Sequence, residues 1–494
     1  MTRGERLDRL HACPPGFAMP MLRHGGVATA MSFQATQIKK RRNSKAMASS
    51  PTTAGLSLDR SALERETMAK VTRRLIPLLM VCYFTAYLDR VNVGFAALTM
   101  NKALGFSAAV FGLGSGIFFV GYFLFEVPSN LLLSKVGARR WIARILITWG
   151  IISGLTAFVW SEWSFFGIRF LLGLAEAGFY PGIILYLTWW FPSYYRSRII
   201  GIFMTAIPIS IIVGSVVSSQ LLLLDGWLGL QGWQWLFILE AVPPVILGVA
   251  VMVYLTDGPA QANWLRPDQR QWLVARLAAE RAQRESIRHY RLGETLLNPR
   301  VWLLTVVYFG QNVSGYGFVL FLPQIVSKFG ASIGQVGLIT AIPYVFGAIA
   351  MVAWGWHSDK TGERNKHAAA ACLLAFAGLA VCVFIDNPVI MMAALVLAQM
   401  GQSAIAPTFW TLPTAMLSGT AAAGGIAMIN AVGNLGGFLG PSLVGFIKDA
   451  TGSFSLGLLV ISMGALLGAV ILLAMGHDRR LEQAPGMQQR VRSA

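Results

Sequence analysis

The sequence predicts an all-α membrane protein in which twelve transmembrane helices form two six-helix bundles. Only 13% of the 494 residues are charged and 55% are hydrophobic, whereas a soluble globular protein is typically about 25% charged. Apolar runs of about 20 residues, the length that crosses a bilayer core as a helix, recur along the chain. A long charged segment, residues 256–300, divides these runs into six and six.

The apolar runs define the expected helices in order. They cover residues 75–97, 109–133, 141–160, 164–187, 198–222 and 233–255 in the first half, and 301–325, 333–355, 368–385, 388–413, 422–446 and 453–475 in the second. Glycine and proline occur inside many runs, and membrane helices tolerate both. Within the charged middle segment, residues 269–284 are expected to form a surface helix. Trp264 and Trp272 in that segment are expected to pack on the bundle or the membrane.

The same pattern gives the domain boundaries. We expect residues 71–255 to form the N-terminal six-helix bundle, residues 256–300 a cytoplasmic linker and residues 301–475 the C-terminal six-helix bundle. Residues 1–70 are basic, polar and poor in aromatic side chains, which is typical of a disordered extension. That extension lacks the apolar stretch of a secretory signal. Residues 476–494 are expected to form a cytoplasmic tail.

The positive charge of the chain indicates its topology. The net charge of +18 comes from 40 Lys and Arg against 22 Asp and Glu. The basic residues gather in the N-terminal segment and in alternate loops, such as those around Arg139 and Arg364. The positive-inside rule then places both termini in the cytoplasm. The lipid bilayer is therefore the expected partner of this chain, and a nucleic-acid-binding face is not expected.

Two corresponding loops suggest that the halves are copies of each other. The second copy fits the pattern G-x-x-x-D-[RK]-x-G-x-[RK], beginning at Gly355, passing through Asp359 and ending at Arg364. The first copy departs from it, with Asn130 at the glycine position and Ser134 at the acidic position. This loop resembles a signature of the major facilitator superfamily, which implies the major facilitator fold.

Further stretches narrow the resemblance. They are YLDRVN at 87–92, FEVPSN at 125–130, RFLLGLAEAG at 169–178, WFP at 190–192 and WLFILE at 235–240. Together they resemble the anion:cation symporter family of organic-anion transporters, and the similarity covers about residues 60–480. Among its members, bacterial tartrate-type and other organic-acid transporters are the most similar.

That resemblance implies a secondary active transporter of the bacterial inner membrane. The expected reaction is proton-coupled symport, in the direction of uptake, of a small organic anion. A tartrate-like dicarboxylate or a hydroxy or sugar acid is the first expectation for the substrate. An aromatic-acid permease for phthalate or hydroxyphenylacetate, and an antiporter or exporter of the same fold, remain open alternatives.

Ionisable residues inside the apolar runs are the first candidates for function, because a charge in the membrane is costly. They are Asp89, Arg90, Glu126, Arg169, Glu176 and Glu240. All lie in the first six runs, so we expect the charge chemistry in the N-terminal half. The alternative is a static ion network that only orders the helices, and this is the favoured interpretation for Glu240.

Spacing and chemistry suggest separate roles for these charges. Arg90 offers a planar, permanently charged fork to a substrate carboxylate, and Tyr87 shares its helical face. Arg169 and Glu176 lie seven residues apart, so they share a face about 10 Å apart. Asp89 and Glu176 are interpreted as the proton carriers. A substrate on Arg90 would reduce the field of that cation at Asp89, so substrate binding and protonation would favour each other.

The family resemblance assigns the same roles to these positions. It places substrate on Arg90, proton coupling on Asp89 and Glu176, and Arg169 beside Glu176 as its partner. In the second half it favours three residues as cavity-lining, namely Gln311, Trp410 and Asn430. Interhelical hydrogen bonding, worth only about 0.6 kcal/mol on average in a membrane, is the alternative for those three.

Tyr87 and Tyr122 complete the predicted substrate-contact set in the first half. No Walker-type phosphate loop, catalytic triad or metal-ligand spacing is found in the sequence. We therefore expect no enzyme activity and no cofactor or metal, with the proton gradient as the energy source. A small organic anion and protons are the expected ligands, and the chain is expected to work as a monomer.

Overall fold

The computed structural model describes residues 51–285, 297–416 and 419–476. The chain divides into two units, residues 1–64 and residues 65–494, and the second unit contains the helical bundle. The helices of the first half and the linker are α2 (Pro51–Leu104), α3 (Ala108–Val136), α4 (Ala138–Leu155), α5 (Glu162–Glu176), α6 (Phe179–Trp190), α7 (Ser193–Met204), α8 (Ala206–Leu221), α9 (Gly232–Tyr254) and α10 (Pro267–Glu285). Those of the second half are α12 (Pro299–Ser327), α13 (Ile333–Thr361), α14 (Asn365–Val381), α15 (Pro388–Phe409), α16 (Thr411–Met416), α17 (Gly419–Asn434), α18 (Gly436–Thr451) and α19 (Phe454–Met475). Short 3-10 helices are η1 (Thr156–Phe158), η2 (Leu222–Leu224), η3 (Trp227–Gly229), η4 (Pro259–Gln261) and η5 (Cys382–Phe384), and the described residues contain no strand.

The described helices confirm the predicted membrane fold. Within the described residues, eleven segments are long and apolar enough to cross a bilayer. Some of them consist of two helices end to end, such as α5 with α6 and α7 with α8. The remaining predicted run is α12, which has 29 residues but carries Gln311 and Asn312 near its middle. These two amides interrupt its apolar sequence, and α12 is not among the eleven segments. The count of twelve crossings and the cytoplasmic position of both termini stay predictions.

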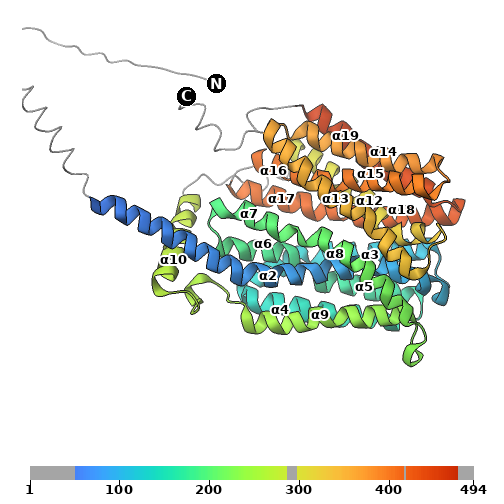
Figure 1. Ribbon diagram of the computed structural model, residues 1–494, viewed down its shortest axis with the longest axis horizontal. Coiled ribbons are helices and arrows are strands. Elements are labelled where there is room, and N and C mark those ends of the chain that lie inside the picture. The colour runs from blue at the N-terminus through green and yellow to red at the C-terminus, as the bar shows by residue number, and fades with distance from the viewer. Residues whose placement is uncertain (1–50, 286–296, 417–418, 477–494) are drawn as a thin grey trace, which may run out of the picture. The chain divides into compact units, whose positions relative to one another are not determined.

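The two halves of the bundle pack internally and then against each other. In the first half α4 packs on α9 and α3 on α5, while in the second half α14 packs on α15 and α19. Figure 1 shows the second-half helices, in yellow to red, gathered beside those of the first half, in blue to green. The halves meet chiefly where α3 packs on α18 and α8 on α13.

The contact between the halves is closest at one end of the bundle. A Cβ atom on Gly112 would lie 2.2 Å from the carbonyl oxygen of Pro441, and one on Gly337 would lie 2.3 Å from that of Ser215. These backbones approach closely because the glycines lack side chains. Both contacts lie near the ends where α3 and α13 begin. This is the end predicted to face away from the cytoplasm.

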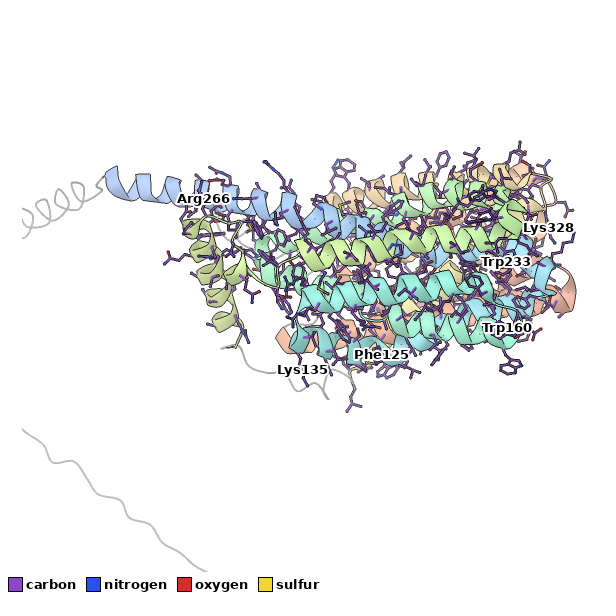
Figure 2. All side chains as sticks on the ribbon, turned by 90° about the horizontal axis from the view of Figure 1, so that it is seen from below. Phe125, Lys135, Trp160, Trp233, Arg266 and Lys328 are labelled. Atoms are coloured by element: carbon purple, nitrogen blue, oxygen red, sulfur yellow. The ribbon has the colours of Figure 1, made fainter. Side chains whose placement is uncertain are left out.

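Labelled side chains show the two ends of the bundle. In Figure 2, Lys135 and Arg266 lie toward one end, and Trp160, Trp233 and Lys328 lie toward the other. Lys135 and Arg266 belong to segments predicted to be cytoplasmic. Loops that are predicted to lie on opposite sides of the membrane are therefore found at opposite ends of the bundle.

The N-terminal boundary differs from the predicted one. α2 runs without a break from Pro51 to Leu104, so residues 51–70, which were assigned to a disordered extension, are helical. The apolar run beginning at residue 75 is only part of this longer helix. Residues 1–50 and 477–494 lie outside the described part of the chain.

The linker contains a surface helix, as predicted. α10 includes residues 269–284, and its Glu280 carboxylate lies 3.6 Å from an Arg196 guanidinium nitrogen at the start of α7. Before this helix, the Trp264 ring stacks on Trp190 with 5.4 Å between ring centroids. The linker is thus attached to the first bundle by a tryptophan stack and an ion pair.

The repeated loop holds an acidic residue in both copies, from different places in the sequence. In the second copy the Asp359 carboxylate contacts the Arg364 guanidinium at 2.5 Å. In the first copy Ser134 occupies the acidic position, and Asp257, which follows α9 in the sequence, supplies the carboxylate instead. Its Oδ1 accepts a hydrogen bond of 2.8 Å from the backbone N–H of Arg139, at the start of α4.

Candidate functional site

A cavity of about 300 Å³ lies between the two halves. All residues predicted to contact substrate line it, namely Arg90, Tyr87 and Tyr122 from the first half and Gln311, Trp410 and Asn430 from the second. Further tyrosines from both halves line the same space. A single chain therefore supplies a complete pocket of the size of a small organic molecule.

Arg90 is the positive charge of this cavity. Its guanidinium forms an ion pair with Glu176 of α5, and its Nη1 lies 3.4 Å from the hydroxyl oxygen of Tyr316 on α12. The guanidinium carbon also lies 5.0 Å from the ring centroid of Tyr87 and 5.7 Å from that of Tyr122. The Nε atom is buried without a hydrogen-bond partner. Arg90 thus keeps unused donor capacity at the boundary between the two halves.

A helix break positions Glu176. α5 ends at Glu176, and Gly178 adopts φ 83°, in the left-handed region that favours glycine. A Cβ atom on Gly178 would lie 2.2 Å from the Ser129 hydroxyl oxygen on α3. The buried Glu176 carboxylate is therefore at the end of its helix, where it reaches Arg90.

Asp89 faces a different environment from its neighbour Arg90. Its carboxylate accepts hydrogen bonds from Trp149 and Ser153 on α4, and from Asn92 Nδ2 at 3.0 Å. Asp89 is buried and does not line the cavity. Adjacent residues on a helix diverge by about 100°, which explains the separation. The carboxylate in direct contact with Arg90 is therefore Glu176, and Asp89 is held by neutral donors.

Arg169 lies on α5, the helix that ends at Glu176. It is buried, and its guanidinium carbon is 5.2 Å from the ring centroid of Phe118. It interacts electrostatically with both Asp89 and Glu176. The predicted partnership with Glu176 is thus a longer-range one, because the ion pair of Glu176 is made with Arg90.

The second half contributes amides and aromatic rings. Gln311 donates from Nε2 to the side chain and the backbone of Gln402, and Asn430 Nδ2 donates to Glu126 Oε1 at 2.8 Å. The Trp410 ring packs edge-on against Tyr308, with 4.9 Å between centroids. This wall contains no charged residue among the described cavity-lining residues.

Sequence reasoning missed Tyr316, Tyr308 and Gln402 as cavity residues. Each is an aromatic or amide side chain inside an apolar run, the same signal that identified Gln311 and Trp410. Glu240, favoured as structural, accepts a hydrogen bond of 2.7 Å from Ser218 and does not line the cavity. Among the residues that the structure describes, no cluster of three potential metal ligands occurs.

Comparison with known proteins identifies the family. The profile of the Major Facilitator Superfamily matches residues 79–441 and 304–491. The chain belongs to this superfamily. A relative from Agrobacterium vitis, named "Putative tartrate transporter", is 54% identical over 417 residues, covering 84% of this chain and 96% of the relative.

Two further comparisons show how far the similarity extends. A "Quinolone resistance transporter" of Acinetobacter baumannii is 40% identical over 409 residues, covering 83% of this chain and 94% of the relative. The crystal structure of a bacterial homolog of the human lysosomal transporter Spinster, inward-facing and occupied, superimposes with a TM-score of 0.67 at 16% identity. It covers 83% of this chain and 98% of that structure.

These findings confirm the family and fold predicted from the motifs. The chain is a multi-pass membrane protein and a Major Facilitator Superfamily transporter, not an enzyme. Arg90 therefore lines the central cavity of a transporter, and its partner Glu176 is buried behind it and does not line the cavity.

Proposed function

We propose that this chain catalyses proton-coupled uptake of a small organic anion across a bacterial inner membrane. The observation that carries the proposal is the buried ion pair between Arg90 and Glu176 at the wall of the central cavity. The first candidate substrate is a tartrate-like dicarboxylate or a related hydroxy or sugar acid. The transporter works as a monomer without a bound cofactor, and the proton gradient supplies its energy.

Arg90 supplies the anion site. A guanidinium binds a carboxylate through two parallel hydrogen bonds, which gives both affinity and orientation. Its aromatic neighbours Tyr87 and Tyr122 exclude water and so strengthen the attraction. A cavity of about 300 Å³ suits a small acid rather than a large one.

Competition for Arg90 supplies the coupling. Without substrate, Glu176 occupies the guanidinium. A substrate carboxylate that takes its place leaves Glu176 as a buried anion without its partner, which is costly in low dielectric. Uptake of a proton by Glu176 removes that cost, so anion and proton bind together. Asp89 is a second proton site, electrostatically linked through Arg169.

Relatives support both the substrate class and one alternative. The relative named as a tartrate transporter favours a hydroxylated dicarboxylate. The relative named as a quinolone resistance transporter leaves the exporter alternative open, and the rings of Tyr308 and Trp410 in the cavity are compatible with an aromatic acid.

The test is transport by the purified full chain in proteoliposomes. We expect an inward proton gradient to drive accumulation of tartrate from a panel that includes succinate, gluconate, phthalate and hydroxyphenylacetate. Collapse of the gradient with a protonophore should abolish accumulation but leave tartrate exchange. Accumulation that persists without the gradient would contradict proton coupling, and selective transport of phthalate would favour the aromatic alternative.

A further inference from the structure

The amide side chains of the second-half wall direct their NH₂ groups toward acceptor atoms of the protein. Gln311 Nε2 lies 3.3 Å from the backbone oxygen of Gln402, and Asn312 Nδ2 lies 3.0 Å from that of Gly433. A carbonyl oxygen can only accept a hydrogen bond, so each partner requires the NH₂ group of the amide to point toward it. The NH₂ groups of these cavity-lining amides are therefore engaged by the protein.

Asn430 has the same arrangement, but its partner comes from the other half. Its Nδ2 donates to Glu126 Oε1 at 2.8 Å, which joins α17 to α3. Glu126 is buried and does not line the cavity, while Asn430 does. A carboxylate oxygen is an acceptor, so Glu126 fixes which way the Asn430 amide points.

Acceptor atoms are left over on this wall. Gln311 Oε1 is buried without a hydrogen-bond partner. Because Glu126 binds the Nδ2 of Asn430, the acceptor oxygen Oδ1 lies on the other side of that amide group. The first-half wall instead provides Arg90, which has an unpartnered Nε and lies beside the hydroxyl of Tyr316 on the second-half helix α12. The cavity therefore has a charged donor for a carboxylate on the first half and amide acceptor oxygens on the second half.

We propose that the second-half wall selects substrates by their hydroxyl groups, and that Glu126 is the positioning residue that holds Asn430 as a hydroxyl acceptor. This inference rests on the proposed transport of an organic anion and adds the basis of its selectivity. A hydroxyl placed against Asn430 Oδ1 or Gln311 Oε1 donates a hydrogen bond to an amide oxygen that is held in place by the protein. An acid without hydroxyls gains neither hydrogen bond and so binds less tightly.

A purely structural role for Glu126 is the competing explanation. The bond between Glu126 and Asn430 ties α3 to α17, so its loss would loosen the two halves. Such loosening would weaken the binding of all substrates by a similar factor. The positioning role instead predicts a change in the ratio between hydroxylated and unhydroxylated acids.

The experiment measures binding of tartrate, malate and succinate to the purified full chain by calorimetry. These acids share four carbons and two carboxylates and carry two, one and no hydroxyls. The wild-type protein is expected to bind them in that order of strength. Glu126→Leu should reduce the preference for tartrate over succinate by about fivefold, mainly through weaker tartrate binding. Glu126→Gln should retain most of the preference, because its carbonyl oxygen still accepts from Asn430.

Gln311→Met provides a second, independent variant, since it removes the acceptor Oε1 and keeps the length of the side chain. It should reduce the same preference without altering Glu126. Equal weakening of tartrate and succinate in Glu126→Leu, or an unchanged ratio in both variants, would overturn the selectivity mechanism alone. Failure of the wild-type protein to bind any of the three acids would instead overturn the proposed substrate class.

Discussion

Adjacent residues on α2 have separate surroundings, and this separation decides which carboxylate responds to substrate. Arg90 faces the cavity and pairs with Glu176, whereas the Asp89 carboxylate is bound by Trp149 and Ser153 of α4. A substrate that takes Arg90 therefore removes the partner of Glu176 and leaves the hydrogen bonds of Asp89 in place. Coupling should begin at Glu176, with Asp89 affected through longer-range electrostatics.

Arg90→Ala tests the anion site at the scale of one residue. It should weaken binding of the transported anion by at least about 100-fold, because a bidentate charged contact is lost. Arg90→Lys, which keeps the charge without the planar fork, should bind the anion with an affinity between those of the wild-type protein and Arg90→Ala. Calorimetry with purified protein measures the affinities.

The folding cost of this change can be separated from its binding cost. Arg90→Ala leaves Glu176 as an unpaired buried charge, which should lower thermal stability. Adding Glu176→Gln should restore stability without restoring binding. Wild-type affinity in Arg90→Ala would remove this residue from the substrate site.

Glu176→Gln tests the proton carrier. Uptake driven by an inward proton gradient should fall by more than about tenfold, since the amide cannot bind and release the coupled proton. Exchange of labelled for unlabelled substrate should continue, because exchange needs no net proton movement. Asp89→Asn is the matched comparison, and normal gradient-driven uptake in Glu176→Gln would assign the carrier role elsewhere.

At the scale of helices, α3 begins against a carboxylate from the other half. Asp449 near the end of α18 accepts hydrogen bonds from the backbone N–H groups of Ala108 at 3.1 Å and Ala109 at 2.7 Å. The first N–H groups of a helix have no partner within it, and its dipole favours a negative charge there. Asp449 therefore stabilises the closed contact between α3 and α18 at this end of the bundle.

Asp449→Ala should shift the protein toward a state that is open at this end. The expected change in the population ratio is on the order of threefold to tenfold, from the loss of two hydrogen bonds and a favourable dipole contact. Spin labels attached at Lys102→Cys on α2 and Thr451→Cys on α18, in a Cys13→Ser background, should show a larger fraction of long distances between the two labels. Asp449→Asn keeps one acceptor oxygen and should change the population ratio less. Unchanged distances in Asp449→Ala would show that the carboxylate does not stabilise the closed contact between α3 and α18.

At the scale of the whole molecule, local features were predictable from the sequence and contacts between distant segments were not. The length of apolar runs predicted the helices, and isolated charges predicted Arg90 and Glu176. The pairing of these two residues, which are 86 positions apart, depends on how α2 and α5 pack. The bond between Glu126 and Asn430 spans 304 positions and joins the halves, so no periodicity within one helix could indicate it. The start of α2 at Pro51 was not predicted, because polar residues before an apolar run can extend the same helix.

Alternating access requires the halves to close and separate around the cavity, and the glycine contacts at the closed end provide a test. Gly112→Ala places a Cβ atom 2.2 Å from the carbonyl oxygen of Pro441, which prevents the backbones from reaching their present distance. Transport should fall by more than about tenfold, while each half still folds, because the clash is confined to the closed state. Gly167→Ala on α5 is the matched control, since its added Cβ atom meets nothing within 4 Å, and it should transport normally. Wild-type uptake rates in Gly112→Ala, measured in proteoliposomes at equal reconstituted amounts, would show that the transport cycle does not require this close approach.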